Sequence, residues 1–277
     1  MKTDKTKRLG LILASLHQGA SVKLWTQLAQ NAAQDANPFF IFAGGRLGKK
    51  SESDHLRNSI YNLVNTENLD ALISWASAIG SGGSFDELKQ FHAHLEPLPF
   101  VTIGQKISGT TENHPCADFD AYEGMRSLLR HFIDVHHAKK IAFLHGPASH
   151  KSAQERYTAY VETVRSEGYS SDEISNLTSS SFSWNEGEKA IKELVEVRGL
   201  VPGRDFDALV ASSDMMALAA EKYLEKKGWK IPEDIILGGF NNSEECNVAD
   251  PPLTTVHMPH CELGMDAYKM APALMNG

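Results

Sequence analysis

Short apolar runs alternate with amphipathic stretches along the first hundred residues. The runs Arg8–Ala14, Phe39–Phe42 and Asp70–Trp75 are brief and mostly apolar, which predicts buried strands. Between them, Val22–Gln34 and Ser51–Asn65 place apolar residues three or four positions apart, which predicts helices. The chain therefore begins with strands and helices in strict alternation.

The same alternation continues to residue 239. The further predicted elements are a helix at Phe85–His94, a strand at Pro99–Ile103, a helix at Tyr122–Val135, a strand at Lys140–His145, helices at Ser152–Glu167 and Trp184–Val197, a strand at Asp207–Ala211, a helix at Met215–Lys227 and a strand at Ile235–Gly239. Nearly continuous apolar strands that alternate with helices predict an α/β fold, in which helices cover both faces of parallel sheets.

A length of 277 residues suits one large domain or two modest ones. The longest irregular stretch, Lys106–Pro115, separates two series of strands and helices. We therefore expect two doubly wound parallel-sheet lobes with a ligand cleft between them. In sheets of this kind, ligands bind outside the carboxyl ends of the strands.

Composition narrows the class of protein. A net charge of -8 argues against nucleic-acid binding by this part of the chain alone. No apolar run reaches the roughly 18 residues that a membrane span needs. The apolar run Leu9–Leu16 contains Gly10 and Ser15 and lacks a cleavage pattern, which favours a buried strand over a signal peptide. Three widely spaced cysteines indicate a reduced, cytoplasmic protein.

Motifs that would indicate catalysis or a cofactor were not found. The glycine-rich run Gly80–Gly83 matches neither phosphate-binding pattern, and a flexible loop is the better interpretation. His257, His260 and Cys261 lie close together in sequence, but no second cluster completes a metal site. We therefore expect no enzyme, no metal and no cofactor.

Several segments, in a consistent order and spacing, carry a resemblance to a known family. They are Leu69–Ile73, Asp120 with Gly124, Lys139–Pro147, Glu155–Tyr157, Pro232–Asp234, Gly239–Asn242, Leu253–Val256 and Glu262–Gly264. From about residue 7 to 277, the chain resembles the effector-binding domain of the LacI/GalR family of bacterial regulators. The resemblance implies the type I periplasmic-binding-protein fold, with lobes at 1–138 plus 242–256 and at 139–241 plus 257–277. It also implies three hinge crossings between the lobes.

A narrower similarity concerns the protein's output. Leu24-Trp25, Phe42–Gly45 and Arg57–Tyr61 resemble versions of this domain that precede diguanylate cyclases or histidine kinases. Ordinary family members instead carry a helix-turn-helix headpiece. About seven residues precede the first strand, so DNA contact is expected only through a headpiece absent from this chain. The family also implies a homodimer.

The resemblance suggests polar ligand-binding residues, of which Asp120 belongs to the expected first lobe and the others to the second. Arg156 corresponds to an arginine that binds a ligand hydroxyl or carboxylate, the alternative being a surface ion pair with a neighbouring glutamate. Asp120 corresponds to an aspartate that accepts hydrogen bonds from ligand hydroxyls, or it caps the next helix. Ser213 takes a ligand-facing position, whereas Asp214 is the better candidate for a helix cap. Asn241 replaces an aspartate, so an amide that donates and accepts stands there.

Aromatic and loop residues complete the candidate site. Phe182 corresponds to an aromatic residue that stacks on a sugar or base, with Trp184 as its alternative and core packing as the other interpretation. The remaining candidates lie at or just after the ends of predicted strands of the first lobe: His17, Gln18, Trp75 and Gln105.

These residues together suit a sugar, a polyol or a nucleoside. We therefore expect a small-molecule sensing domain, in which ligand closes the two lobes and biases an attached output. The alternative is a solute-binding protein of a transport system, which would need a signal peptide or a lipid anchor. An α/β enzyme is a third possibility, and it would need a catalytic constellation.

Overall fold

The chain forms two compact units. The computed structural model describes residues 6–17, 21–48, 52–107, 114–168, 175–176 and 179–276. One unit comprises Met1–Phe119 with Pro259–Gly277, and the other comprises Asp120–Met258. Each unit is built around one parallel five-stranded sheet, as the α/β prediction required.

The sheet of the first unit has the strand order β2-β1-β3-β4-β5. Its strands are β1 (Leu9–Leu13), β2 (Phe39–Ala43), β3 (Ala71–Ser74), β4 (Phe100–Ile103) and β5 (Cys116–Ala117). All neighbours run parallel, and Leu9 lies in register with both Phe39 and Ala71. The carboxyl ends of the strands therefore share one edge of the sheet.

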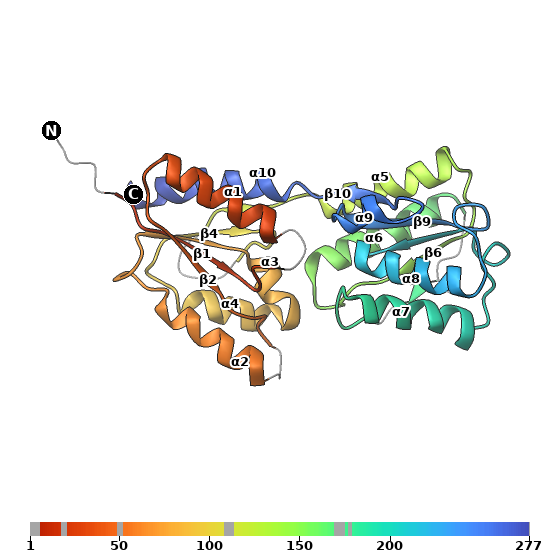
Figure 1. The fold of residues 1–277 in the computed structure, drawn as a ribbon, viewed down its shortest axis with the longest axis horizontal. Helices are drawn as coiled ribbons and strands as arrows, with labels where there is room; N and C mark the ends of the chain where they lie inside the picture. The colour runs from red at the N-terminus through yellow and green to blue at the C-terminus, as the bar shows by residue number, and fades with distance from the viewer. Residues whose placement is uncertain are drawn as a thin grey trace. The chain divides into compact units, whose positions relative to one another are not determined.

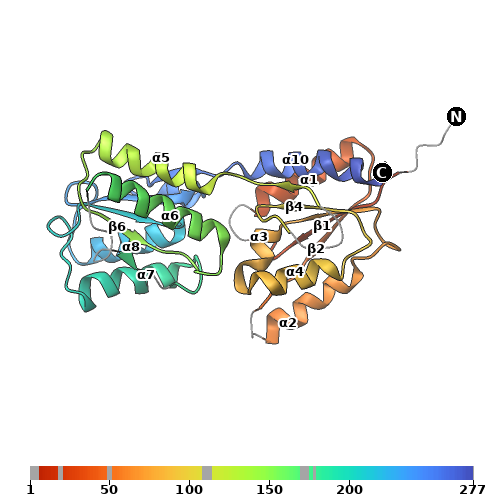
Figure 2. The ribbon, with the colours of Figure 1, turned by 180° about the vertical axis from the view of Figure 1, so that it is seen from behind.

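Helices cover both faces of this sheet (Figures 1 and 2). Leu11 and Leu13 of β1 belong to a cluster with α1 (Ser21–Gln34) and α10 (His260–Met270). Ile12, which points to the opposite face, packs with α3 (Ala76–Ile79) and α4 (Phe85–Ala93). The helix α2 (Glu52–Asn58) continues into the 3₁₀ turn η1 (Ser59–Leu63), and η2 (Gly80–Gly82) and η4 (Ala271–Asn276) are further short turns.

The sheet of the second unit has the strand order β10-β9-β8-β6-β7, and its neighbours also run parallel. Its strands are β6 (Ile141–Leu144), β7 (Ser175–Asn176), β8 (Ala208–Ala211), β9 (Ile236–Asn241) and β10 (Thr254–His257). The short helix α9 (Glu245–Val248) lies between β9 and β10 in the chain.

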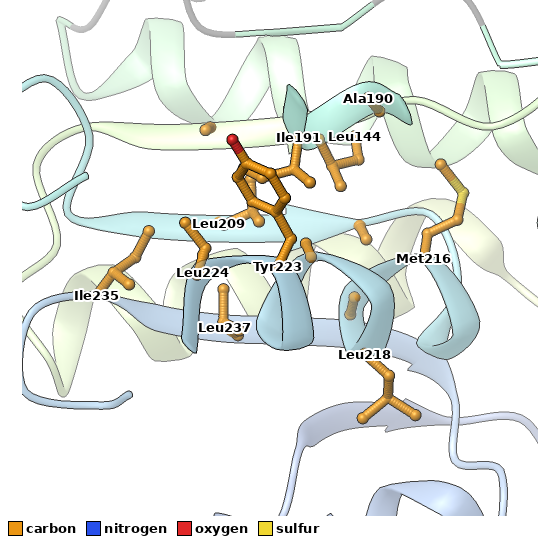
Figure 3. Close-up of a cluster of buried hydrophobic side chains, with 14 of the residues drawn as sticks. Leu144, Ala190, Ile191, Leu209, Met216, Leu218, Tyr223, Leu224, Ile235 and Leu237 are labelled. Carbon is orange, nitrogen blue, oxygen red and sulfur yellow. The ribbon is translucent and has the colours of Figure 1, made fainter. Parts of the chain in front are cut away.

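Helices cover both faces of the second sheet (Figures 1 and 2). On one face, α7 (Trp184–Lys192) and α8 (Asp214–Lys226) enclose a cluster that joins Leu209 and Leu237 to Tyr223 (Figure 3). On the other face lie α5 (Ala121–Asp134) and α6 (Lys151–Ser166). Tyr160 of α6 stacks on Phe143 with ring centroids 4.7 Å apart, and its hydroxyl donates to the Ile141 carbonyl at 2.8 Å.

The predicted strands and helices are present, with ends shifted by a few residues. The predicted helix Ser51–Asn65 is divided into α2 and η1, and Ser51 lies outside the described residues. The predicted helix at Trp184–Val197 finishes in a π-helical turn at Glu193–Val197. The elements β5, β7, α9, β10 and α10 were not predicted. The first four have two to four residues, too few for a periodic pattern.

The two units divide the chain differently from the expected lobes. The segment 120–138 and the strand β10 belong to the second unit, because β10 pairs with β9 in register from Thr254 to His257. Residues 259–277 belong to the first unit, because α10 packs against α1. The chain consequently passes from one unit to the other after Phe119 and again after Met258.

Candidate functional site in the second unit

The carboxyl ends of β6, β8 and β9 gather polar residues at one edge of the second sheet. His145-Gly146-Pro147 follow β6, Ser212-Ser213 follow β8, and Asn241 ends β9. The backbone N–H of Gly146 donates to Oγ of Ser212 at 2.9 Å, which joins the loops after β6 and β8. A rigid sheet therefore holds these loops in fixed positions, as the parallel strand order predicts.

Arg156 lies at the centre of this edge, although it belongs to a helix. It stands in the second turn of α6, and its side chain is only 3% exposed. Its Nη1 donates to the Ser212 carbonyl at 2.5 Å, and its guanidinium carbon lies 3.8 Å from the centre of the Phe240 ring. The ring of Phe182 is 5.6 Å away. Arg156 is thus a buried cation against aromatic faces, and the alternative of a surface ion pair is wrong.

Burial dominates the electrostatics of Arg156. Loss of hydration lowers the pKa of its guanidinium to about 9, against smaller opposing effects of Asp214 and Glu155. The guanidinium still carries its charge at neutral pH. Burial also lowers the pKa of nearby His145, so this imidazole is neutral at pH 7. Of Arg156 and His145, Arg156 is therefore the residue that carries a positive charge at pH 7.

Ser213 and Asp214 are both nearly fully buried and carry structural hydrogen bonds. Ser213 is the N-cap of α8: its Oγ accepts from the Met216 N–H at 3.3 Å and donates to the Phe182 carbonyl at 3.1 Å. The predicted capping role therefore falls to Ser213 and not to Asp214. The ligand-facing role predicted for Ser213 is not tested by these contacts.

Asp214 joins the start of α8 to the segment after β9. Its carboxylate accepts from Oγ1 of Thr255 at 2.5 Å and from the backbone N–H of Ser243 at 2.8 Å. Both carboxylate oxygens are therefore engaged inside the unit. Asp214 fixes the loop that follows β9, where Asn241 and Asn242 both have positive φ values of 123° and 57°.

Phe182 lies beside the buried arginine, and Asn241 follows Phe240 at the end of β9. Phe182 lies just before α7 and is half-buried, with its ring against Gly146 and 5.0 Å from the ring of His150. Asn241 is half-buried at the end of β9. Phe182, Asn241, Ser213 and Arg156 were predicted separately, and the structure places all four at the same edge of one sheet.

Asp120 and Trp184 have other surroundings. Asp120 is exposed and is the N-cap of α5, where its carboxylate accepts from the Glu123 N–H at 2.8 Å. This geometry confirms the capping interpretation and leaves the ligand role untested. Trp184 opens α7 and is 36% exposed, so Phe182 is the better placed of the two aromatic candidates.

The candidates of the first unit lie at the carboxyl ends of its own strands. His17 is exposed in the loop after β1, and Gln18 lies outside the described residues. Trp75 follows β3, is 8% exposed and packs on His260 with ring centroids 5.5 Å apart. Gln105 follows β4, and its amide donates to the Lys106 carbonyl at 3.5 Å. Trp75 is therefore mainly a packing residue of its own unit.

Sequence reasoning missed three contributors to the site. The Ser212 carbonyl holds Arg156, the Phe240 ring lies under its guanidinium, and Thr255 binds Asp214. Phe240 and Thr255 lie inside segments that carry the resemblance to the family, and Ser212 directly precedes the candidate Ser213. The sequence pattern could not indicate the contacts of Arg156 with the Ser212 carbonyl and the Phe240 ring, because both contacts depend on where α6 packs.

Two general properties bear on the kind of site. In the described part of the chain, no three histidine, cysteine, aspartate or glutamate side chains are grouped as metal ligands. None of the described helices combines the length and the apolar character that a membrane crossing requires.

Comparison with known proteins places the chain in a family. Residues 129–277 match the model of the periplasmic-binding-protein-like domain, and the chain belongs to this family. The regulator CelR of Thermobifida fusca, an HTH-type transcriptional regulator, is 29% identical over 173 residues, which are 62% of this chain and 49% of that protein. The curated relatives are transcriptional regulators and not enzymes.

Solved structures share the fold. A LacI family transcriptional regulator from Mycobacterium smegmatis has a TM-score of 0.80 at 22% identity, over 97% of this chain and 91% of that chain. A CelR–cellobiose complex has a TM-score of 0.78 at 22% identity, over 98% of this chain and 80% of that chain. The predicted architecture of two parallel-sheet lobes, like that of periplasmic binding proteins of type I, is thereby confirmed.

The chain spans about half to two thirds of the length of the first curated relatives that it matches. These relatives are described as helix-turn-helix regulators and not as fusions to signalling enzymes. The expected closer likeness to signalling chains therefore receives no support from them.

Proposed function

We propose that this chain is the effector-binding domain of a LacI-type transcriptional regulator and that its effector is a sugar-like or nucleoside-like small molecule. The observation that carries this proposal is Arg156, a buried cation held against Phe240 at the carboxyl ends of β6, β8 and β9. Parallel α/β sheets bind ligands at this edge, and family membership makes a ligand-binding role the expected one.

The half-buried Phe182 and Asn241 supply the other contacts that such an effector needs. An aromatic face suits the apolar face of a sugar ring or a base, and an amide can both donate to and accept from hydroxyl groups. The solved CelR complex contains cellobiose, which supports a sugar-like ligand for this chain as well.

Effector binding acts on the output through a change in conformation. A ligand shifts an equilibrium between two conformations only by the difference in its affinity for them. We propose that this difference biases a DNA-binding headpiece in a cytoplasmic homodimer, in line with the helix-turn-helix relatives. A signalling enzyme as the output is the alternative, and operator binding by the full-length protein, with its response to effector, distinguishes the two.

A thermal-shift screen tests the proposal. The panel contains sugars, sugar acids, sugar phosphates, polyols, nucleosides and purine bases. A ligand that binds only the folded state at 100 times its Kd adds about 2.7 kcal/mol to the free energy of unfolding, which raises the melting temperature by several degrees.

The matched variants are Arg156→Ala and Arg130→Ala. Arg130 belongs to the same unit but pairs with Glu167 at 2.5 Å, away from Arg156. A hit that is lost in Arg156→Ala and kept in Arg130→Ala supports the proposal. A hit that survives in both variants moves the site elsewhere. The absence of any hit with folded protein contradicts the proposed effector class.

A further inference from the structure

Most hydrogen-bond donors of Arg156 have no acceptor within the described residues. A guanidinium has five N–H donors. The bond from Nη1 to the Ser212 carbonyl uses one of them, and the buried Nε has no hydrogen-bond partner. A buried polar group without a partner destabilises the folded state, and a charged one does so more strongly. Such a group at a strand-end edge indicates that its partner comes from a bound molecule.

The charge of Arg156 is also uncompensated by direct contact. Among the described residues, no carboxylate forms a salt bridge with it. The two acidic groups whose charges act on Arg156, Asp214 and Glu155, form their contacts with other residues. Thr255 and Ser243 occupy the oxygens of Asp214, and Glu155 pairs with Lys151 at 3.3 Å. A neutral ligand hydroxyl would accept a hydrogen bond from Arg156 but would leave its charge unpaired.

The aromatic contact limits how a ligand can reach the guanidinium. The guanidinium carbon lies over the Phe240 ring, 3.8 Å from its centre. The N–H groups radiate in the plane of the guanidinium, so an acceptor must approach an edge of that plane. Two oxygens of one carboxylate or phosphate fit two adjacent N–H groups at such an edge.

We propose that the effector carries a carboxylate or phosphate group and that Arg156 is the counter-charge for it. The inference rests on the function proposed above and narrows its ligand class from sugar-like molecules to their anionic derivatives. Asn241, at the end of β9, is an amide and does not repel an anion as a carboxylate would.

Matched pairs of neutral and anionic compounds test the proposal by calorimetric titration of the whole chain. The pairs are glucose with glucose 6-phosphate, ribose with ribose 5-phosphate, and galactose with galacturonate. In at least one pair, we expect the anion to bind about 100-fold more tightly than its neutral parent. Titrations with the acid and with the phosphates separately identify which anion the site takes.

Variants then assign the preference to Arg156. Arg156→Gln keeps a hydrogen-bond donor but removes the charge, so the anion should fall to the affinity of its neutral parent. Arg156→Lys keeps the positive charge but lacks the paired N–H groups of a guanidinium, so it should retain part of the preference for the anion over its neutral parent. The matched control Arg130→Gln should leave the affinities for both members of the pair unchanged.

The possible results separate this inference from the proposed function. If a neutral parent binds as tightly as its anion, the anionic class is overturned, whereas the sugar-binding function stands. If the anion is preferred equally by wild type and Arg156→Gln, the role of Arg156 is overturned. If no compound of any pair binds to folded protein, both proposals are overturned. Should Arg156→Gln not fold, the comparison of neutral and anionic compounds on wild type still decides the ligand class.

Discussion

Replacing Arg156 with methionine should leave the fold intact and should make it no less stable in the absence of added effector. Methionine has a similar length, is apolar and adapts to irregular surroundings. It would occupy the place of a guanidinium that is 3% exposed and rests on Phe240. The substitution therefore removes a buried charge without leaving a large cavity.

The expected magnitude follows from the burial of the charge. Burial lowers the pKa of Arg156 from its ordinary value to about 9, and at about 1.36 kcal/mol per pKa unit this corresponds to a penalty of roughly 5 kcal/mol. The penalty is present in full at pH 7, below both values, and lessens only as the pH rises above about 9. Against it stand a charged hydrogen bond to Ser212, about 1.5–3 kcal/mol, and the contact with Phe240, about 0.5–2 kcal/mol. Arg156→Met should therefore change the free energy of unfolding by between zero and about +3 kcal/mol.

Urea denaturation at pH 7, followed by circular dichroism, measures this change through the midpoint and the slope. The control is Arg130→Met, which removes a half-exposed ion pair with Glu167 and should cost no more than about 1 kcal/mol. A loss of more than about 1 kcal/mol in Arg156→Met would refute the reasoning, because it would show that Arg156 stabilises the fold by its contacts. The predicted outcome, together with lost effector binding, marks Arg156 as a residue retained for function.

Three further changes test other parts of the structure. Gly187→Ala would bring a methyl group within 2.5 Å of the Met216 backbone, where α7 meets α8. The substitution should lower the free energy of unfolding by about 1–3 kcal/mol in urea titration, and an unchanged midpoint would contradict this close approach. Asp214→Ala should cost about 2–4 kcal/mol in the same assay, because two half-buried donors lose their buried acceptor, and a cost below about 1 kcal/mol would argue against this bonding. Burial lowers the pKa of His92 from 6.5 to about 4, so its stabilising effect is complete above pH 6.5 and is lost by about 3 kcal/mol as the pH falls from 6.5 to 4. His92→Gln should flatten that part of the stability–pH curve, and an unchanged slope would assign the dependence to other groups.

The alternation of strands and helices could be predicted from local pattern alone. The strands β6 and β8 are buried along their whole length in a parallel sheet, so every residue in them is apolar. Helices such as α5 show one apolar face, with Met125, Leu129 and Phe132 buried. Both signals are contained in consecutive residues, and this is why the fold class was predictable.

The division into units and the surroundings of the site were decided by tertiary packing. The short strand β10 has half-exposed and exposed residues, and only its pairing with β9 assigns it to the second unit. Asp214 was predicted to cap a helix, yet its neighbour Ser213 does so, because Asp214 is drawn to donors far along the chain.

The sequence by itself determined that Arg156 belongs to a candidate site, through its place in a motif beside a strand end. It did not determine that the guanidinium is buried, lies on Phe240 and has one hydrogen bond to the Ser212 carbonyl. These contacts join residues 56 and 84 positions apart in the chain. Burial and pairing of a charge depend on which distant atoms surround it, and only the packing of α6 against the loops after β8 and β9 brings those atoms together.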